Sequence, residues 1–202
     1  MTMVKVCGVT SVADALLAAE AGADAIGLNF SPHSPRRVAI DVAATISAAL
    51  PAGVCRVGVF VDAPREEVRA IAEQVGLDAL QFHGSEDPAS CAGWHCKTIK
   101  ALRVRDADTL ARAGAYAVDL ILADAYVEGR FGGTGQRVPA DWLVSVPSER
   151  LILAGGLTPD NVADAIRAVR PLAVDVASGV ERAPGVKDRE KVERFIANAK
   201  TA

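Results

Sequence analysis

Short apolar runs alternate with alanine-rich, helix-forming stretches along the whole chain, and this alternation constrains the fold more than any other feature. The apolar runs are dense in Val, Ile and Leu, as is typical of parallel strands covered on both faces. The strand candidates are MVKVCG, DAIGLNF, CRVGVFVD, DALQFHG, CKTIKAL, DLILADA, RLILAGG and LAVDVASG. The helix candidates are 11–22, 41–50, 64–75, 86–93, 106–114, 140–145, 159–169 and 188–200. Strand followed by helix predicts right-handed crossovers and a parallel sheet.

Eight such units account for the 202 residues and predict an α/β fold, a single-domain (β/α)₈ TIM barrel over residues 1–202. An open doubly wound sheet would produce the same order of elements. The glycine-rich ends of the last two strands and the small size of each unit favour the closed barrel. The length lies at the bottom of the barrel range, which leaves no room for a second domain.

Several residues predict helix ends. Thr10 and Ser11 precede the first helix, and Pro64 and Pro159 mark the starts of the third and seventh. Glycines stand where helices should end in a left-handed cap: Gly22, Gly76 and Gly114.

Composition and charge exclude several classes of protein. Half of the chain is hydrophobic, which suits a sizeable core, and 22 basic residues balance 25 acidic ones. This balance argues against nucleic acid or an anionic membrane as the main partner. We see no signal peptide and no membrane-spanning run, so a cytoplasmic protein is expected. The four cysteines form no CxxC pair, so we expect reduced thiols, no metal site and no cofactor.

In barrels of this kind, functional residues lie where strands end and the following loops begin. That rule selects these candidates: Cys7, Asn29, Asp62, His83, Lys100, Asp124, Gly155–Gly156 and Ser178–Gly179.

The last two strand ends predict a phosphate site. AGG closes the seventh strand and ASG closes the eighth, where such barrels commonly hold a phosphate. Backbone N–H groups of Gly155, Gly156, Ser178 and Gly179 could approach an anion closely. The alternative is that these glycines only form tight turns.

A thiol and a carboxyl group end the first and sixth strands. Cys7 is a plausible general base if its pKa is lowered, and Asp124 a plausible proton donor. Cys7 could equally be a small buried hydrophobe and Asp124 a helix cap. Arg36 and Arg37 follow the second strand in a polar segment, where arginines are usually solvated. Residues 129–135, GRFGGTG, could form a lid or an ordinary exposed loop.

The chain resembles the phosphoribosylanthranilate isomerase family over essentially its whole length. The resemblance rests on KVCGVT, FSPHSPRR, QFHG, LADA, FGGTG, LAGGLTPDNV, VDVASGVE and PGVKD, in this order. Two departures are Ala177, where many relatives have serine, and LADA in place of the more usual LLD-type run.

By that resemblance, the reaction is an Amadori rearrangement of N-(5′-phosphoribosyl)anthranilate in tryptophan biosynthesis, with no cofactor. Cys7 matches the general base, Asp124 the general acid, and Arg36 an arginine facing the anthranilate carboxylate. His83 lies among the substrate-binding residues, and the two glycine loops match the phosphate site. The implied partner is the small phosphoribosyl substrate, and the enzyme is expected to be a monomer or homodimer.

Three other functions stay open at this stage. A Schiff-base barrel enzyme would use Lys5 or Lys100. The related histidine-pathway isomerase would have aspartate at the position of Cys7, and a non-catalytic barrel would bind phosphate without turnover.

Strand geometry makes one further prediction, which lies below the active site. Side chains alternate along a strand, so Lys5 shares the inner face with Cys7 and lies about 7 Å deeper. A buried ammonium requires a partner, and the neighbouring eighth strand offers Asp175. We therefore predict a buried Lys5–Asp175 ion pair that also favours the Cys7 thiolate; otherwise, Asp175 would face the helices.

Overall fold

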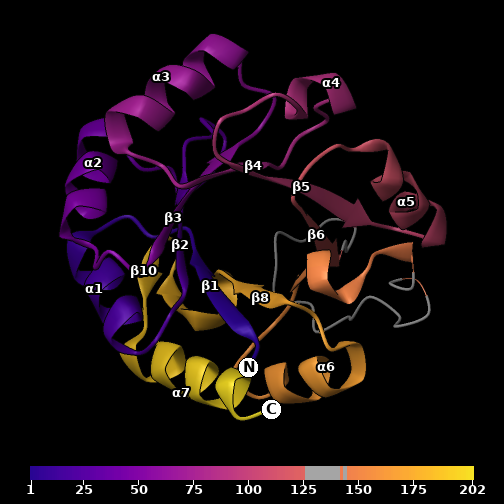
Figure 1. Cartoon of the computed structure of the whole chain (residues 1–202). Coiled ribbons are helices and arrows are strands. Elements are labelled where there is room, and N and C mark those ends of the chain that lie inside the picture. The colour runs from indigo at the N-terminus through magenta and orange to yellow at the C-terminus, as the bar shows by residue number, and fades with distance from the viewer. Residues whose placement is uncertain (126–141, 143–144) are drawn as a thin grey trace.

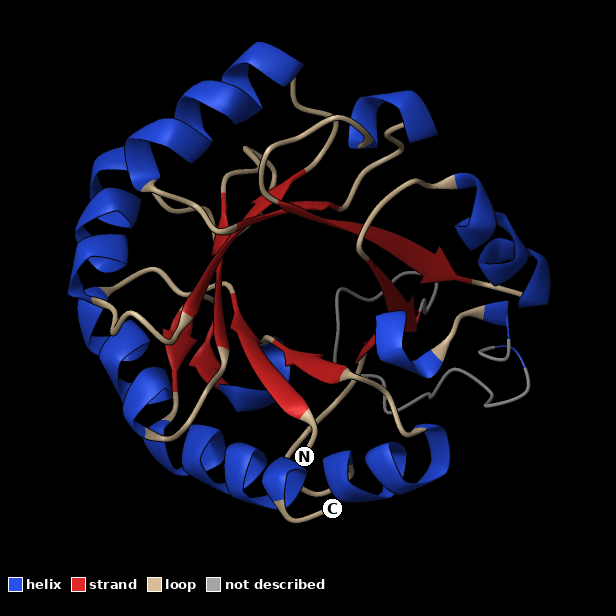
Figure 2. Ribbon diagram, viewed as in Figure 1, coloured by secondary structure: helices blue, strands red, loops and turns tan. Residues whose placement is uncertain are grey.

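The computed structural model describes residues 1–125, 142 and 145–202. In this part of the chain, eight parallel strands form a closed barrel in sequence order, from β1 to β8 (Figure 1). Helices surround the strands on the outside (Figure 2). The structure confirms the predicted single (β/α)₈ barrel and excludes the open sheet.

Each barrel strand coincides with one of the apolar runs. The strands are β1 (Met3–Cys7), β2 (Ala25–Asn29), β3 (Cys55–Phe60), β4 (Ala79–Phe82), β5 (Lys97–Val104), β6 (Leu120–Ala125), β7 (Leu151–Ala154) and β8 (Ala173–Val176). The α-helices are α1 (Val12–Glu20), α2 (Ile40–Ala49), α3 (Arg65–Val75), α4 (Pro88–Cys91), α5 (Ala107–Ala111), α6 (Val162–Val169) and α7 (Arg189–Lys200). Short 3₁₀ turns are η1 (Arg112–Ala115), η3 (Ser148–Arg150) and η4 (Ser178–Val180).

Two apolar clusters hold the barrel together. The larger one packs the outer faces of the strands against the helices. The smaller one fills the barrel interior with every second residue of the strands, including Val57, Ala79, Ile99, Ala101, Leu122, Ile152, Ala154 and Ala173. This alternation decides which polar side chains reach the inside.

The predicted helix ends are partly confirmed. Ser11 caps α1 by accepting a hydrogen bond from the Asp14 N–H, and Gly76 caps α3 with a left-handed backbone. Gly22 also has a positive φ. The prediction for Gly114 is wrong, because this glycine lies inside η1, which continues α5 as a tighter turn.

Two helix predictions have other outcomes. Helix α6 begins at Val162 rather than at residue 159, because residues 158–161 form a turn closed by the Asn161 side chain. The helix predicted over 140–145 lies almost wholly outside the described residues.

A hairpin that the sequence analysis did not predict follows η4. It consists of β9 (Glu181–Ala183) and β10 (Val186–Lys187), which pair antiparallel. The hairpin packs on the loop after β1, where the Thr10 hydroxyl donates to the Gly185 carbonyl at 2.7 Å. The Lys187 N–H donates to the Asp14 carboxylate at 3.1 Å. The end of the chain thus folds back over its beginning.

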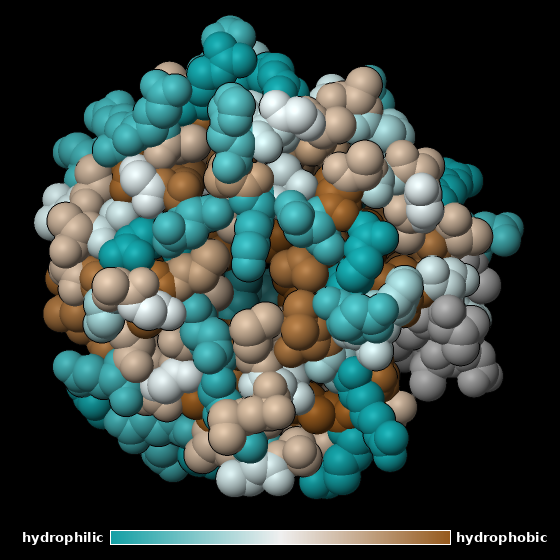
Figure 3. Space-filling model, in the orientation of Figure 1, coloured by the Kyte–Doolittle hydropathy of each residue, from teal (hydrophilic) through white to brown (hydrophobic). Residues whose placement is uncertain are grey.

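Few large hydrophobic side chains of the described residues are exposed on the outer surface. The face shown in Figure 3 is hollowed at its centre, with hydrophilic side chains spread around the rim. Among the described residues, the exposed large hydrophobic side chains are Met1, Met3 and Val42. None of the described helices has the length and apolar character needed to cross a membrane. All four cysteines are free thiols.

Candidate active site

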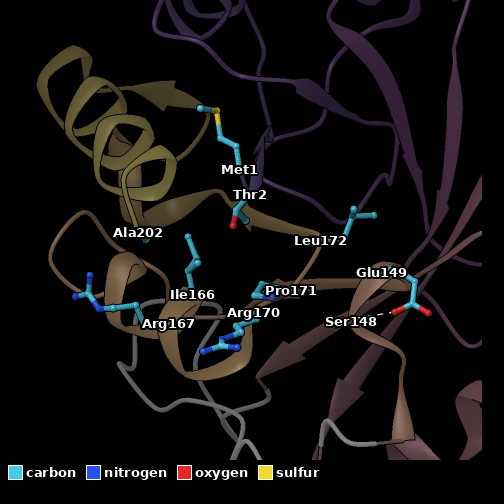
Figure 4. Close-up of a pocket in the computed structure, with 10 residues that line it drawn as sticks. All are labelled: Met1, Thr2, Ser148, Glu149, Ile166, Arg167, Arg170, Pro171, Leu172 and Ala202. Atoms are coloured by element: carbon cyan, nitrogen blue, oxygen red, sulfur yellow. Dashed lines mark hydrogen bonds between the residues drawn. The ribbon is translucent and has the colours of Figure 1, made fainter.

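A cavity of about 620 Å³ lies at the amino ends of the strands, beside both chain termini (Figure 4). Met1, Leu172 and Ala202 line it together with Arg167 and Arg170. None of the predicted site residues is among its lining residues. Since chemistry in these barrels takes place at the opposite end of the strands, we place the candidate site elsewhere.

The carboxyl ends of the strands bring three of the predicted side chains to one mouth. Cys7 ends β1, His83 directly follows β4, and Asp124 lies near the end of β6. His83 is four residues beyond the interior residue Ala79, and Asp124 is two beyond the interior residue Leu122. All three therefore continue inner faces of the barrel.

Asp124 and His83 lie side by side. His83 Nε2 is 3.4 Å from Asp124 Oδ2, and both side chains are partly exposed. The other ring nitrogen, Nδ1, is 2.8 Å from Nε2 of the buried Gln81. Strand β6 is three strands away from β1 around the closed barrel, so Asp124 lies across the mouth from Cys7.

The predicted ion pair beneath Cys7 is confirmed. Lys5 Nζ donates to Asp175 Oδ1 at 2.8 Å, the residues are register partners on β1 and β8, and both are buried. A Cβ placed on Gly27 of β2 would lie 2.7 Å from Cys7 Sγ and 3.1 Å from Lys5 Nζ. The thiol and the ammonium group therefore gather beside the same interior position.

The electrostatics of Cys7 correct one expectation. Burial raises the pKa of the Cys7 thiol, and the Lys5 and Lys187 ammonium groups only partly offset this effect. The pKa of the free thiol is therefore raised, whereas the sequence analysis expected a lowered pKa if Cys7 acts as a base. Burial opposes the charge of Lys5, but Asp175 and Cys7 together raise its pKa. A lysine held in its charged form is a poor nucleophile, which argues against Lys5 as a Schiff-base residue.

A second buried charge cluster lies beside Cys7, and the sequence analysis missed it. Lys187 Nζ donates to the Cys7 carbonyl at 2.6 Å and to Glu181 Oε1 at 2.9 Å. Glu181 also accepts two-pronged hydrogen bonds from Nε and Nη2 of Arg36 at 2.7–3.1 Å. The hairpin β9–β10 supplies both Glu181 and Lys187. Arg36 is thus anchored rather than solvated, and its Nη1 group is not used by Glu181.

The pKa directions within this cluster follow from burial and pairing. Burial lowers the pKa of Lys187, against the attraction of Glu181. Burial would raise the pKa of Glu181, but hydrogen bonds from Arg36 and Lys187 lower it overall. The SGVE and PGVKD motifs were the available signal for this cluster, although neither motif predicts the contacts.

The loops after β7 and β8 approach each other closely. A Cβ on Gly179 would lie 1.9 Å from the Leu157 carbonyl oxygen, so only glycine fits there. Gly155 and Gly156 both have positive φ, 88° and 63°. Asn161 closes the first loop by donating to the Gly156 carbonyl and accepting from the Thr158 N–H. The turn geometry alone accounts for these glycines.

Three other candidates from the strand-end rule have structural contacts. Lys100 alternates with the interior residues Ile99 and Ala101, and therefore points away from the barrel interior. It is buried against Glu86 at 2.6 Å, so its placement at the mouth was wrong. Asp62 accepts from the Ser85 N–H, and Asn29 from the Ser31 N–H. The glycine-rich segment 129–135 lies outside the described residues.

A closed (β/α)₈ barrel with a thiol and a carboxyl group across its mouth defines a TIM-barrel enzyme equipped for acid–base chemistry. The family model for N-(5′-phosphoribosyl)anthranilate isomerase matches residues 4–198. The isomerase of Pseudomonas fluorescens is 53% identical over 194 residues, covering 95% of each chain. The chain therefore belongs to the N-(5′-phosphoribosyl)anthranilate isomerase family, enzymes of tryptophan biosynthesis.

Solved structures agree with this family. The phosphoribosyl anthranilate isomerase of Thermotoga maritima has a TM-score of 0.93 and 41% identity, covering 100% of both chains. An isomerase solved in complex with reduced 1-(o-carboxyphenylamino)-1-deoxyribulose 5-phosphate has a TM-score of 0.89 and 40% identity, again covering 100% of both chains.

Proposed function

We propose that Cys7 is the general base and Asp124 the general acid in the isomerisation of N-(5′-phosphoribosyl)anthranilate. The observation that carries this assignment is their placement on inner faces of β1 and β6, three strands apart at one mouth. A ribose between them can receive a proton on one side and lose one on the other.

The chemistry runs in two proton transfers. Asp124 protonates the furanose ring oxygen, and the C1′–oxygen bond breaks to leave a protonated imine between C1′ and the anthranilate nitrogen. This cation acidifies the neighbouring C2′–H, whose proton the Cys7 thiolate removes. The C–H electron pair forms the C1′–C2′ double bond and neutralises the nitrogen. The resulting enolamine then tautomerises to the ketone.

The raised pKa of Cys7 makes the thiolate a minor species but a stronger base once it forms. Lys5 and Lys187 act against the raised pKa and so increase the thiolate fraction. The cationic imine attracts the thiolate as well, which favours ionisation in the substrate complex.

The remaining polar groups suit the two anionic ends of the substrate. Arg36 is held by Glu181 through Nε and Nη2, so its outer edge remains for the anthranilate carboxylate. The loops carrying Gly155–Gly156 and Ser178–Gly179 converge and suit the 5′-phosphate, with His83 on the far side of the mouth. The ligand in the solved isomerase complex described above has a carboxyphenyl group and a phosphate. These are the two anionic ends that the arrangement proposed here would bind.

We further propose that the enzyme works in the cytoplasm on this small phosphoribosyl substrate, as a monomer or homodimer. The family and the absence of a membrane-spanning helix among the described residues support this setting.

An Asp124→Asn variant tests the acid role. It keeps the shape of the side chain and removes the titrating proton. Turnover, followed as loss of phosphoribosylanthranilate fluorescence, should fall by roughly 10²–10⁴-fold. Affinity for the product should stay close to that of the wild type, because the phosphate and carboxylate contacts remain. Turnover equal to the wild type would refute the assignment.

A further inference from the structure

We propose that Gln81 is a positioning residue that keeps the proton of His83 on Nε2 and thereby directs an N–H at Asp124. This inference rests on the proposed role of Asp124 as the acid. It concerns a side chain below the mouth, which acts on the reaction only through His83.

Gln81 lies deep in the barrel wall. It is on the inner face of β4, two residues beyond Ala79, and it is completely buried. Its register partners on the neighbouring strands are Val59 and Ile99, both apolar. The contact with His83 is the only hydrogen bond of the Gln81 side chain among the described residues.

The geometry of this contact determines where the His83 proton lies. Gln81 Nε2 is 2.8 Å from His83 Nδ1, and an amide nitrogen can only donate. His83 Nδ1 must therefore accept, which places the ring proton on Nε2 in the neutral imidazole. His83 Nε2 is the atom 3.4 Å from Asp124 Oδ2.

The opposite amide orientation would reverse this arrangement. With Gln81 Oε1 facing the ring, His83 would carry its proton on Nδ1. Its Nε2 would then be unprotonated and could only accept a hydrogen bond from a protonated Asp124. The orientation in the structure leaves Gln81 Oε1 buried and without a partner among the described residues. Such an orphaned oxygen is costly, and a methionine would fill the same space without it. We infer that the donor function is why a glutamine occupies this position.

The N–H on His83 Nε2 affects the proposed acid, Asp124, after it has given up its proton. When Asp124 gives its proton to the ring oxygen, the carboxylate that forms can accept a hydrogen bond from His83 Nε2–H. This bond stabilises the state after proton transfer more than the state before it. The gain therefore appears in kcat rather than in KM. The 3.4 Å separation without substrate is consistent with a contact that tightens in the reacting complex.

The test combines ¹⁵N NMR of the histidine rings with steady-state kinetics on Gln81→Met. In the wild type, the His83 ring should be protonated on Nε2 and unprotonated on Nδ1. In Gln81→Met, His83 should show a mixture of tautomers, whereas the exposed His33 and His95 serve as internal controls and stay unchanged. We expect kcat to fall roughly 10- to 100-fold with KM nearly unchanged. The melting temperature should be equal or higher, since an orphaned oxygen is removed.

A Gln81→Glu variant changes the ring signal in another way. A carboxylate beside Nδ1 can only accept, so His83 should carry a proton on Nδ1, and the unprotonated-Nδ1 signal of the wild type should disappear. A wild-type His83 protonated on Nδ1 alone would overturn the inference. So would a Gln81→Met variant with unchanged kcat. The NMR readout does not depend on turnover, whereas Asp124→Asn tests the acid assignment, so failure of one is distinguishable from failure of the other.

Discussion

Two buried ammonium groups, Lys5 and Lys187, lie near the Cys7 thiol and act against the effect of its burial. Lys5 is paired with Asp175, and Lys187 with Glu181. Each lysine is therefore buried as part of an ion pair rather than as an isolated charge. At the scale of single residues, the proposed base is a thiol whose ionisation depends on partners one layer below and beside it.

A Cys7→Ser variant tests this residue directly. A hydroxyl of nearly the same size keeps the packing but is a far weaker base at the C2′ proton. Turnover should fall by roughly 10²–10⁴-fold, with product affinity largely kept. Cys96→Ser is the matched control, because Cys96 directly precedes β5 at the amino ends of the strands, and this variant should leave turnover unchanged. Full activity in Cys7→Ser would exclude Cys7 as the base.

At the scale of elements, the Lys5–Asp175 pair joins β1 to β8 where the barrel closes. Lys5→Met leaves Asp175 charged and uncompensated, so the free energy of unfolding should fall by roughly 3–5 kcal/mol. Urea denaturation measures this loss. The double variant Lys5→Met/Asp175→Leu should recover most of it, because no unpaired charge remains buried. A single variant as stable as the wild type would contradict the prediction.

The same variant should change the pH dependence of the reaction. In the proposed mechanism the thiolate is the active form of Cys7, so kcat/KM should rise with pH through the Cys7 pKa. Lys5 lowers that pKa, and its removal should therefore shift the rise to higher pH. A profile identical to that of the wild type would show that Lys5 does not act on the thiol.

The two loops of the proposed phosphate site depend on close backbone contact rather than on side chains. Gly179→Ala would place a methyl group against the Leu157 carbonyl and separate the loops. We expect KM to rise at least about tenfold, since a displaced loop loses its share of the phosphate contacts. Ser178→Ala is the control and should have a smaller effect, because the backbone N–H groups are unchanged. Equal effects of the two variants would favour a side-chain contact instead.

At the scale of the whole molecule, the candidate site unites segments from both ends of the chain. Residues of β1, the loop after β2, β4, β6 and the last hairpin all face one mouth, so ligand binding requires the closed barrel. A product analogue with both anionic groups, at about 100 times its Kd, should stabilise the fold by about 2.7 kcal/mol. The melting temperature should then rise by roughly 5–10 °C. An unchanged melting temperature at that concentration would show that the folded state is not the one that binds.

The sequence by itself determined the barrel and the Lys5–Asp175 pair. These features follow from local rules, because strand alternation decides the inner face and closure makes β1 and β8 neighbours. The extent of the domain over residues 1–202 and the oligomeric state stay predictions.

Only the tertiary structure decided which side chains from distant segments meet. Arg36 binds Glu181 across 145 residues, and Lys187 reaches the Cys7 carbonyl across 180. The sequence rule placed Lys100 at the mouth, whereas its position on β5 turns it outward to Glu86. The close approach of Gly179 to the Leu157 carbonyl, which allows only glycine there, was not predicted from the sequence. Such contacts depend on strand register and loop paths in three dimensions, which no spacing along the chain encodes.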